Sequence, residues 1–242
     1  MALSRELWLL LGAVVALAGV LRGFAGFGSA LVLAPGIALV LGSRDAVVIT
    51  VILNALTLFQ LVVPAITLTR RRIVVPMVIA AAIATPLGTQ LLASIDAHVL
   101  RRAIGAVSIV AAACMLVKLP LPNTTRVVAS LAAGAVSGFA TGLSGMGGPP
   151  AVLYLMADRT TPAAVLRADF IVFLTLGQLA AIPPLVALHV VTWSHVLIAL
   201  ELVPLYVLAT ALGAWGFRRF ENRAFGIIGA AIVVALGFVA LF

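Results

Sequence analysis

The chain has 242 residues, of which 64% are apolar and only 9% are charged, and its formal net charge is +8. Soluble proteins carry charge on about a quarter of their residues, so this composition excludes an ordinary soluble domain and predicts a membrane protein. Most of the basic residues are arginines between apolar runs, which is typical of positive-inside topology signals rather than of a nucleic-acid-binding surface. The single cysteine, Cys114, excludes a disulfide framework or a cysteine metal site within one chain.

The first half of the chain predicts a helix, a break and three longer helices. The N-terminal apolar run follows a charged start, as in a signal peptide, but Glu6 and the lack of a clear cleavage site favour a retained first helix. The glycine-rich stretch GFAGFGS at 23–29 then interrupts helical structure. Uncharged stretches long enough to cross a bilayer predict helices at about 46–69 and 73–95, and a further apolar run predicts a third at about 100–118.

The second half repeats the first. Sliding the sequence by 115 positions aligns GFAGFGS with GFATGLS at 138–144, and it pairs Ser29 with Ser144 and Asn54 with Asp169. We therefore expect two repeated halves in one membrane domain. The first half covers 1–119, the polar segment PLPNTTR at 120–126 links the halves, and the second half covers 127–242.

The second half is expected to hold another glycine-broken pair and helices at about 161–188, 194–217 and 224–242. If each pair forms one broken span, the repeats are parallel and the arginine clusters at 70–72 and 218–223 lie on opposite sides of the membrane. If each pair dips in and returns, the repeats are inverted and both clusters face the cytoplasm.

We favour an all-α fold of two inverted repeats, each with a glycine-broken short helix pair plus three transmembrane helices. The expected limbs 127–141 and 143–157 reach only about 22 Å, which is short of the hydrocarbon core, although two tilted short spans fit almost as well.

The two glycine-rich breaks are the first candidate for a binding site. Broken helices meet near the midplane in many transporters with inverted repeats, and helix N-termini offer an anion N–H donors and a positive dipole end. Isolated glycines are more often packing positions, but two matched clusters with a serine each favour an anion site. Its predicted residues are Gly23, Phe24, Gly26, Gly28, Ser29, Asn54, Gly138, Gly142, Ser144, Gly145, Gly147, Gly148 and Arg167.

Ionisable side chains inside apolar runs are the second candidate, because burying them in a bilayer is costly. Arg167 is expected to hold the anion, while Asp169 and Glu201 are candidates for proton coupling. The alternative is an ion pair that only ties helices together. Arg167 and Glu201 fit both interpretations equally, and the repeat pairing favours function for Asp169. No metal site and no cofactor are expected, since the histidines form no ligand cluster: His98, His189 and His195.

Several segments carry a further signal: GFAGFGSALVLAPGIALVLG at 23–42, the helix ending in RRR, PLGTQLLASI at 86–95 followed by LRRAIGAVSIV, and GFATGLSGMGGPPAVLYLM at 138–156. Together they resemble the sulfite exporter TauE/SafE family of bacterial membrane transporters, over nearly the whole chain. The resemblance implies two repeated halves in the inner membrane and transport of sulfite or organosulfonates. One departure is Ser-Ala-Leu at 29–31, where the family commonly has further glycines, so a tighter half-site is expected.

These observations predict a secondary transporter of a small anion, not an enzyme, working by alternating access and driven by a potential or a proton gradient. A passive anion channel is one competitor. A rhomboid-like intramembrane protease is another, because GLSG at 142–145 matches its Gly-x-Ser-Gly motif and His189 follows downstream of Ser144. The expected partners are a small anion and the lipid bilayer, with no nucleic acid. A homodimer, the identity of the anion, the coupling ion and the transport direction are left open.

Overall fold

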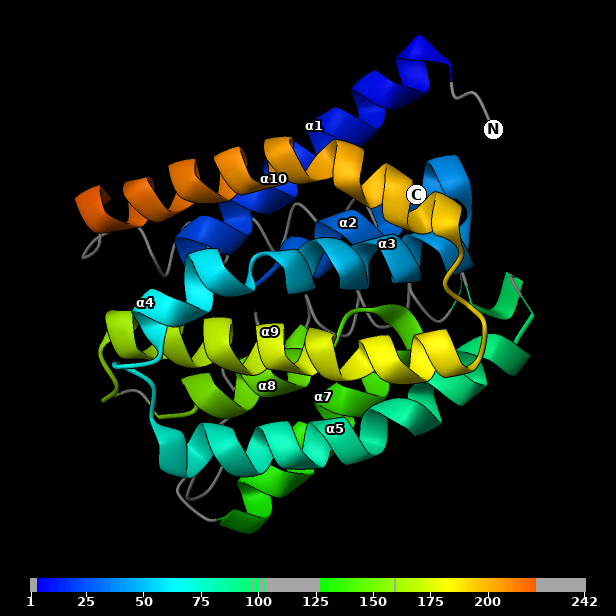
Figure 1. The fold of residues 1–242 in the computed structure, drawn as a ribbon. Coiled ribbons are helices and arrows are strands. Elements are labelled where there is room, and N and C mark those ends of the chain that lie inside the picture. Colours follow the sequence, from blue (N-terminus) through cyan, green and yellow to red (C-terminus); the bar gives the residue numbers. More distant parts are fainter. Residues whose placement is uncertain (1–3, 97, 101, 103–126, 159, 221–242) are drawn as a thin grey trace.

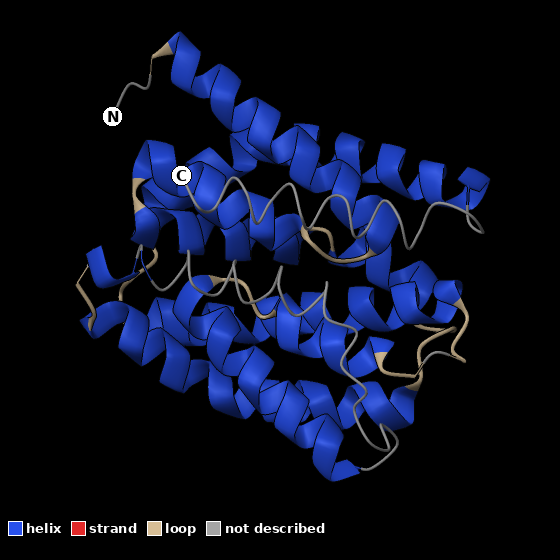
Figure 2. Ribbon diagram, turned by 180° about the vertical axis from the view of Figure 1, so that it is seen from behind, coloured by secondary structure: helices blue, strands red, loops and turns tan. Residues whose placement is uncertain are grey.

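The structure is a computed structural model that describes residues 4–96, 98–100, 102, 127–158 and 160–220. All regular elements in these ranges are helices, as Figure 2 shows from behind. This confirms the all-helical class expected from composition. The helices expected at 100–118 and 224–242 lie outside the described residues, apart from the first positions of the former.

The described helices follow the expected order. The first half contains α1 (Arg5–Ala25), α2 (Ser29–Leu41), α3 (Ser43–Leu56), the π-helix η1 (Leu58–Val62), α4 (Val63–Ala65) and α5 (Arg71–Ser94). The second half contains α7 (Val127–Ser144), α8 (Gly148–Met156), α9 (Ala163–Ala187) and α10 (Trp193–Phe220). Where the sequence predicts one continuous helix at 46–69, the structure has α3 and η1–α4, bent by 45°.

Five described helices are long and apolar enough to cross a membrane, namely α1, α5, α7, α9 and α10, and the bent α3–α4 segment is a sixth if it counts as one span. By contrast, α2 and α8 have only 13 and 9 residues, which is too short for a core of about 30 Å. Each break therefore joins a long helix to a short one. The expectation of two equal fifteen-residue limbs is wrong, because α7 continues through Gly142 for 18 residues.

Glycines in the left-handed conformation end both long first helices. Gly26 has φ 81° and donates its N–H to the carbonyl of Arg22, and Gly145 has φ 71° and donates to the carbonyl of Thr141. Gly145 lies 119 positions after Gly26, so the two breaks correspond in a register that differs by about one helical turn from the one inferred from sequence. In this register Ser29 corresponds to Gly148.

The first helix of each half packs on a long helix of the other half. α1 lies along α10 and α7 lies along α5 (Figure 1). Glycines allow the close approach, because a Cβ at Gly23 would overlap the carbonyl oxygen of Thr210 and one at Gly142 would overlap that of Thr85. The two contacts are reciprocal, so each half packs its first helix against the other half.

The helices run in two opposite directions. In Figure 1 the sequence colours of α1, α3 and α10 advance from right to left, and those of α5 and α9 advance from left to right. α7 runs parallel to α5, because Gly134 contacts Met77 and Gly138 contacts Ala81.

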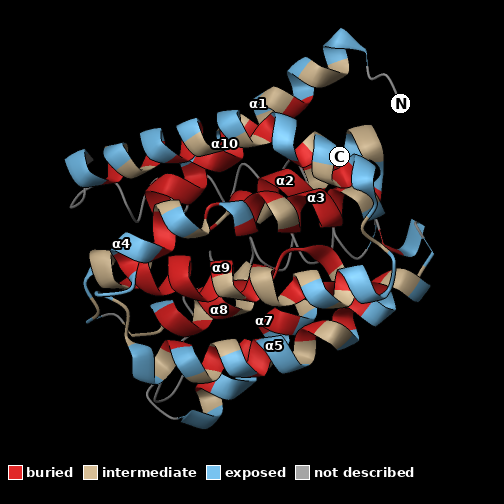
Figure 3. Cartoon of the chain, in the orientation of Figure 1, coloured by how far each residue is buried: buried red, intermediate tan, exposed pale blue. Residues whose placement is uncertain are grey.

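Buried residues gather between the helices, while the outer faces of α1, α5 and α10 are exposed (Figure 3). Many exposed side chains are large and apolar, including Leu9, Phe59 and Ile83, at 68%, 81% and 72% exposure. An outer surface of this kind matches lipid rather than water.

Candidate functional site

A small cavity lies where the two breaks meet. Gly28 and Ser29 line it from the first break, Gly148 and Pro149 line it from the second, and Asn54 of α3 also lines it. Its volume is about 20 Å³, which is room for about one water molecule. Residues that were predicted for one binding site, and that come from both halves of the chain, therefore line the same cavity.

The cavity lies near the middle of the helices that surround it. Asn54 stands near the midpoint of the bent segment from Ser43 to Ala65, and Gln178 lies just past the midpoint of the 25-residue α9. Tyr206, which contacts Asn54, stands at the midpoint of the 28-residue α10. In a chain that spans a bilayer, this position corresponds to the midplane.

Arg22 is the charged side chain of the cavity, and it is only 1% exposed. Its Nε donates to Thr57 Oγ1 at 3.1 Å, and its Nη2 donates to Thr175 Oγ1 at 2.6 Å and to the Asn54 carbonyl at 3.4 Å. All these acceptors are neutral, and none of the ion pairs among the described residues includes Arg22. Because a buried charge without a counter-charge is costly, the site is suited to an anion.

Asn54 organises the polar wall beside Arg22. Its Oδ1 accepts hydrogen bonds from Ser29 Oγ and from Tyr206 Oη, both at 2.7 Å. Its Nδ2 donates to the carbonyl of Thr50 at 3.0 Å. These bonds connect α2 and α3 of the first half with α10 of the second half at the centre of the molecule.

Two helix N-termini also line the cavity. α2 begins at Ser29 and α8 begins at Gly148, and both residues are in the cavity wall. The first N–H groups of a helix have no partner within it, and together with the helix dipole they attract anions. Pro149 lies in the first turn of α8, where a missing N–H disrupts no helical hydrogen bond. The two ends and Arg22 together give the cavity a positive potential.

The other predicted glycines surround the cavity or pack helices. Gly26 and Gly145 form the left-handed turns, and the Gly145 carbonyl accepts from Gln178 Nε2 at 2.9 Å. Gly147 precedes α8 and contacts Thr141 of α7. The remaining ones lie against the backbone of a neighbouring helix: Gly23 on α10, and Gly138 and Gly142 on α5. Phe24 packs edge-on against Phe217, with ring centroids 6.0 Å apart.

Arg167 lies away from the central cavity. Its guanidinium donates to the carbonyls of Gly23 and Phe24 and stands 4.6 Å from the Phe217 ring centroid, so it caps the C-terminal end of α1. It also lines a separate cavity of about 430 Å³ between α4, α9 and α10. Glu201 is exposed on α10.

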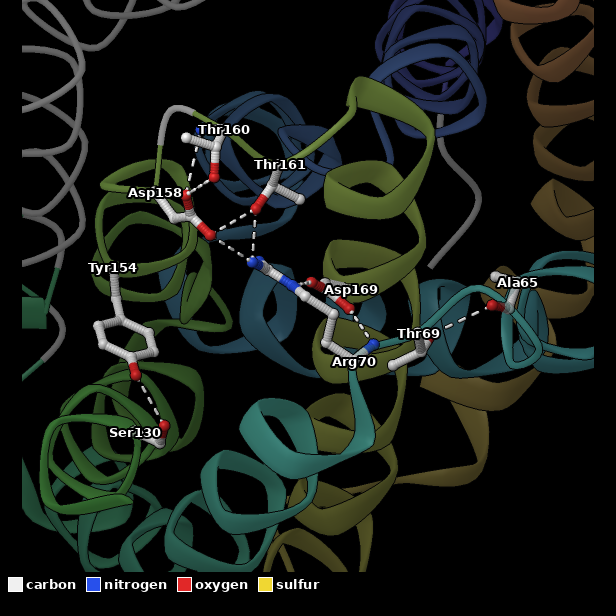
Figure 4. Close-up of polar contacts among 9 residues, drawn as sticks. All are labelled: Ala65, Thr69, Arg70, Ser130, Tyr154, Asp158, Thr160, Thr161 and Asp169. Carbon is white, nitrogen blue, oxygen red and sulfur yellow. Dashed lines mark hydrogen bonds and ion pairs between the residues drawn. The ribbon is translucent and has the colours of Figure 1, made fainter. Parts of the chain in front are cut away.

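Asp169 belongs to a cluster around Arg70 at one end of the bundle (Figure 4). Arg70 Nε lies 2.6 Å from Asp169 Oδ2, and its Nη1 lies 3.1 Å from Asp158 Oδ2 and 2.6 Å from Thr161 Oγ1. Hydrogen bonds from Thr160 and Thr161, together with Arg70, lower the pKa of Asp158 to about 2. Asp158 therefore stays charged near neutral pH. The cluster joins the α4–α5 junction of the first half to the second half.

Sequence reasoning missed Arg22 and Tyr206, and it identified Gln178 as an amide within a span without assigning it to the site. Arg22 precedes the first break by one helical turn, so its distance from Gly26 is the signal that points to it. The signal for Gln178 is only that an amide lies within an apolar run, and Tyr206 has no comparable signal. Both reach the site through the packing of α9 and α10.

Ser144 is not arranged as a nucleophile. Its Oγ donates to the Ala140 carbonyl at 2.8 Å, and no described histidine contacts it. His189 is exposed in the turn after α9. We expect a fluorophosphonate probe to leave Ser144 unlabelled in detergent and in liposomes, as read by mass spectrometry, with a rhomboid protease as positive control. Stoichiometric labelling of Ser144 would contradict this expectation.

Comparison with known protein families matches residues 11–240 to the family described as Sulfite exporter TauE/SafE. No curated protein and no solved structure matches the chain. The family match spans both breaks and both sets of long helices, in agreement with the candidate membrane spans. The chain therefore belongs to the sulfite exporter TauE/SafE family of membrane transporters.

Proposed function

We propose that the protein is a secondary transporter of a small sulfur-containing oxyanion that binds in the central cavity beside Arg22. The observation that carries the proposal is Arg22 itself, which is buried at mid-depth with only neutral hydrogen-bond partners. The N-termini of α2 and α8 add N–H donors on the same cavity. A buried cation with two helix N-termini complements an oxyanion and repels a cation.

The two halves are, on this proposal, inverted repeats. The opposite directions of corresponding helices and the reciprocal packing of α1 on α10 and α7 on α5 support this arrangement. It puts Arg70–Arg72 and Arg218–Arg219 at the same end of the bundle, which the positive-inside rule assigns to the cytoplasm.

The cavity has room for about one water molecule, so the proposed transport cycle requires the two breaks to move apart. The Arg70 cluster is the proposed closure on the cytoplasmic side, because it joins the two halves there. Protonation of Asp169 removes one carboxylate partner of Arg70, so Asp169 is the proposed proton-coupling group. Glu201 has no described ion pair and lies on an exposed face.

Uptake of ³⁵S-sulfite into proteoliposomes tests the function. We expect saturable uptake that is stimulated by unlabelled sulfite on the opposite side, because a carrier returns faster when it is loaded. Uptake without such counterflow would favour a passive channel. If none of sulfite, sulfate, sulfoacetate and simple carboxylates is transported or raises the melting temperature, the proposed function is wrong.

Replacing Asp169 by asparagine is expected to abolish the stimulation of uptake by a proton gradient, because the amide of asparagine takes up no proton near neutral pH. Counterflow exchange should persist, since it needs no net proton movement. The matched control is Asp96→Asn, which changes an exposed carboxylate at the end of α5. Full stimulation of uptake in Asp169→Asn would exclude proton coupling through this residue.

A further inference from the structure

Gln178 belongs to the wall of the central cavity, and its side-chain oxygen has no donor among the described residues. Gln178 is 3% exposed and lines the cavity together with Arg22. Its Nε2 donates to the Gly145 carbonyl, whereas its Oε1 is buried without a partner among the described residues. An unpaired buried acceptor destabilises the protein, because it has lost its hydrogen bonds to water. A donor on the bound anion would satisfy it.

The orientation of this amide is fixed by the second break. The Gly145 carbonyl is an acceptor, so it must face the NH₂ end of the Gln178 side chain. Turning the amide over would place two acceptor oxygens against each other. The left-handed turn at Gly145 therefore ends α7 and also fixes which end of Gln178 is unpaired.

The other polar side chains of the cavity wall donate mainly to partners within the protein. Ser29 Oγ donates to Asn54, and Asn54 Nδ2 donates to the Thr50 carbonyl. Among the described residues, the donors of the cavity wall are thus Arg22, the N–H groups of α2 and α8, and the second amide protons of Asn54 and Gln178. The cavity pairs these donors with the acceptor of Gln178.

We propose that the cavity selects a monoanion that carries its own hydrogen-bond donor, such as hydrogensulfite or a hydroxyalkylsulfonate, over dianions and over anions without a donor. This rests on the proposed function, because it assumes that the anion binds beside Arg22. The anionic oxygens face Arg22 and the helix N-termini, and the ligand O–H donates to Gln178 Oε1.

Charge balance supports the same selection. Arg22 is the only cationic side chain that lines the cavity within the described ranges, and no carboxylate or histidine of those ranges lines it. The neighbouring titratable group is Tyr206, which stands behind Asn54. One negative charge on the ligand is balanced by Arg22, whereas a second would be buried without a partner.

A pair of matched sulfonates tests the donor requirement. Isethionate ends in a hydroxyl where propanesulfonate ends in a methyl group, and both are monoanions. We expect isethionate to inhibit ³⁵S-sulfite uptake at about tenfold lower concentration, the worth of one buried hydrogen bond. Gln178→Met should make the two inhibitors equal. Gln90→Met, which changes an exposed glutamine of α5, should keep the difference.

The pH dependence of sulfite binding gives a test that needs no variant. Thermal-shift titrations should show the affinity for sulfite falling with the hydrogensulfite fraction as pH rises, relative to methanesulfonate, whose charge is constant. Equal inhibition by isethionate and propanesulfonate in the unmodified protein, or an unchanged difference in Gln178→Met, would overturn the proposed selectivity. If no sulfite or sulfonate binds at all, the proposed function itself fails.

Discussion

Replacing Arg22 by glutamine is expected to weaken sulfite binding by about 100-fold and to reduce uptake at low sulfite concentration to the same extent. The estimate corresponds to removing one partner of a buried charge pair. The sulfite affinity of Arg22→Lys should lie between those of the unmodified protein and Arg22→Gln. Lysine keeps the charge but cannot reproduce the planar set of donors that reaches Thr57 and Thr175. Binding is measured by thermal shift or calorimetry, and uptake in proteoliposomes.

The matched control is Arg71→Gln, which removes an exposed arginine at the start of α5 and should leave sulfite affinity unchanged. Size-exclusion profiles and melting temperatures without ligand separate lost binding from lost folding. If Arg22→Gln fails to fold, the sulfite affinity of Arg22→Lys is compared with that of the unmodified protein instead. A folded Arg22 variant with unmodified sulfite affinity would disprove the assignment.

Replacing Gly138 by alanine is expected to lower the melting temperature by about 6–12 °C or to prevent folding. A Cβ there would overlap the carbonyl oxygen of Ala81 and lie 2.7 Å from its carbonyl carbon. Relief requires α5 and α7 to separate, and overpacking of this kind costs about 3 kcal/mol. Fluorescence-detected thermal unfolding in detergent measures the effect.

Gly177→Ala is the matched control for this prediction. Gly177 is a buried helical glycine of α9, and a Cβ there would meet no atom of the described residues within 4 Å. Alanine also favours a helix by about 1 kcal/mol over glycine, so the melting temperature should stay the same or rise by a few degrees. Equal losses in Gly138→Ala and Gly177→Ala would show that close contact between α5 and α7 is not the cause.

The register of the repeat shows where sequence comparison reaches its limit. Gly19 and Gly23 are spaced by one helical turn, as are Gly138 and Gly142, so sliding the chain by either 115 or 119 positions superposes glycines. The structure distinguishes them, because the left-handed turns at Gly26 and Gly145 mark equivalent points. Pairing Asn54 with Asp169 follows from the first register only.

The ionisable residues show that the sequence is also limited in predicting the contacts of charged side chains. The sequence identifies Arg167 and Asp169 as charges within an apolar helix, and burying any charge in a membrane is costly. Their partners are distant in the chain: Arg167 caps the end of α1, and Asp169 meets Arg70 at the α4–α5 junction. Periodicity contains no information about such pairings.

The sequence alone determined the all-helical membrane class, the family and the approximate ends of α5, α9 and α10, because the length of an apolar run and the strength of a helix-breaking glycine are local properties. The sequence also predicted that the two breaks and Asn54 belong to one site, whereas tertiary structure alone decided that Arg22 and Gln178 line it. The physical reason is that the cavity wall comes from five helices, α1, α2, α3, α8 and α9. Only the packing of the two halves on each other determines which buried charge meets which neutral partner.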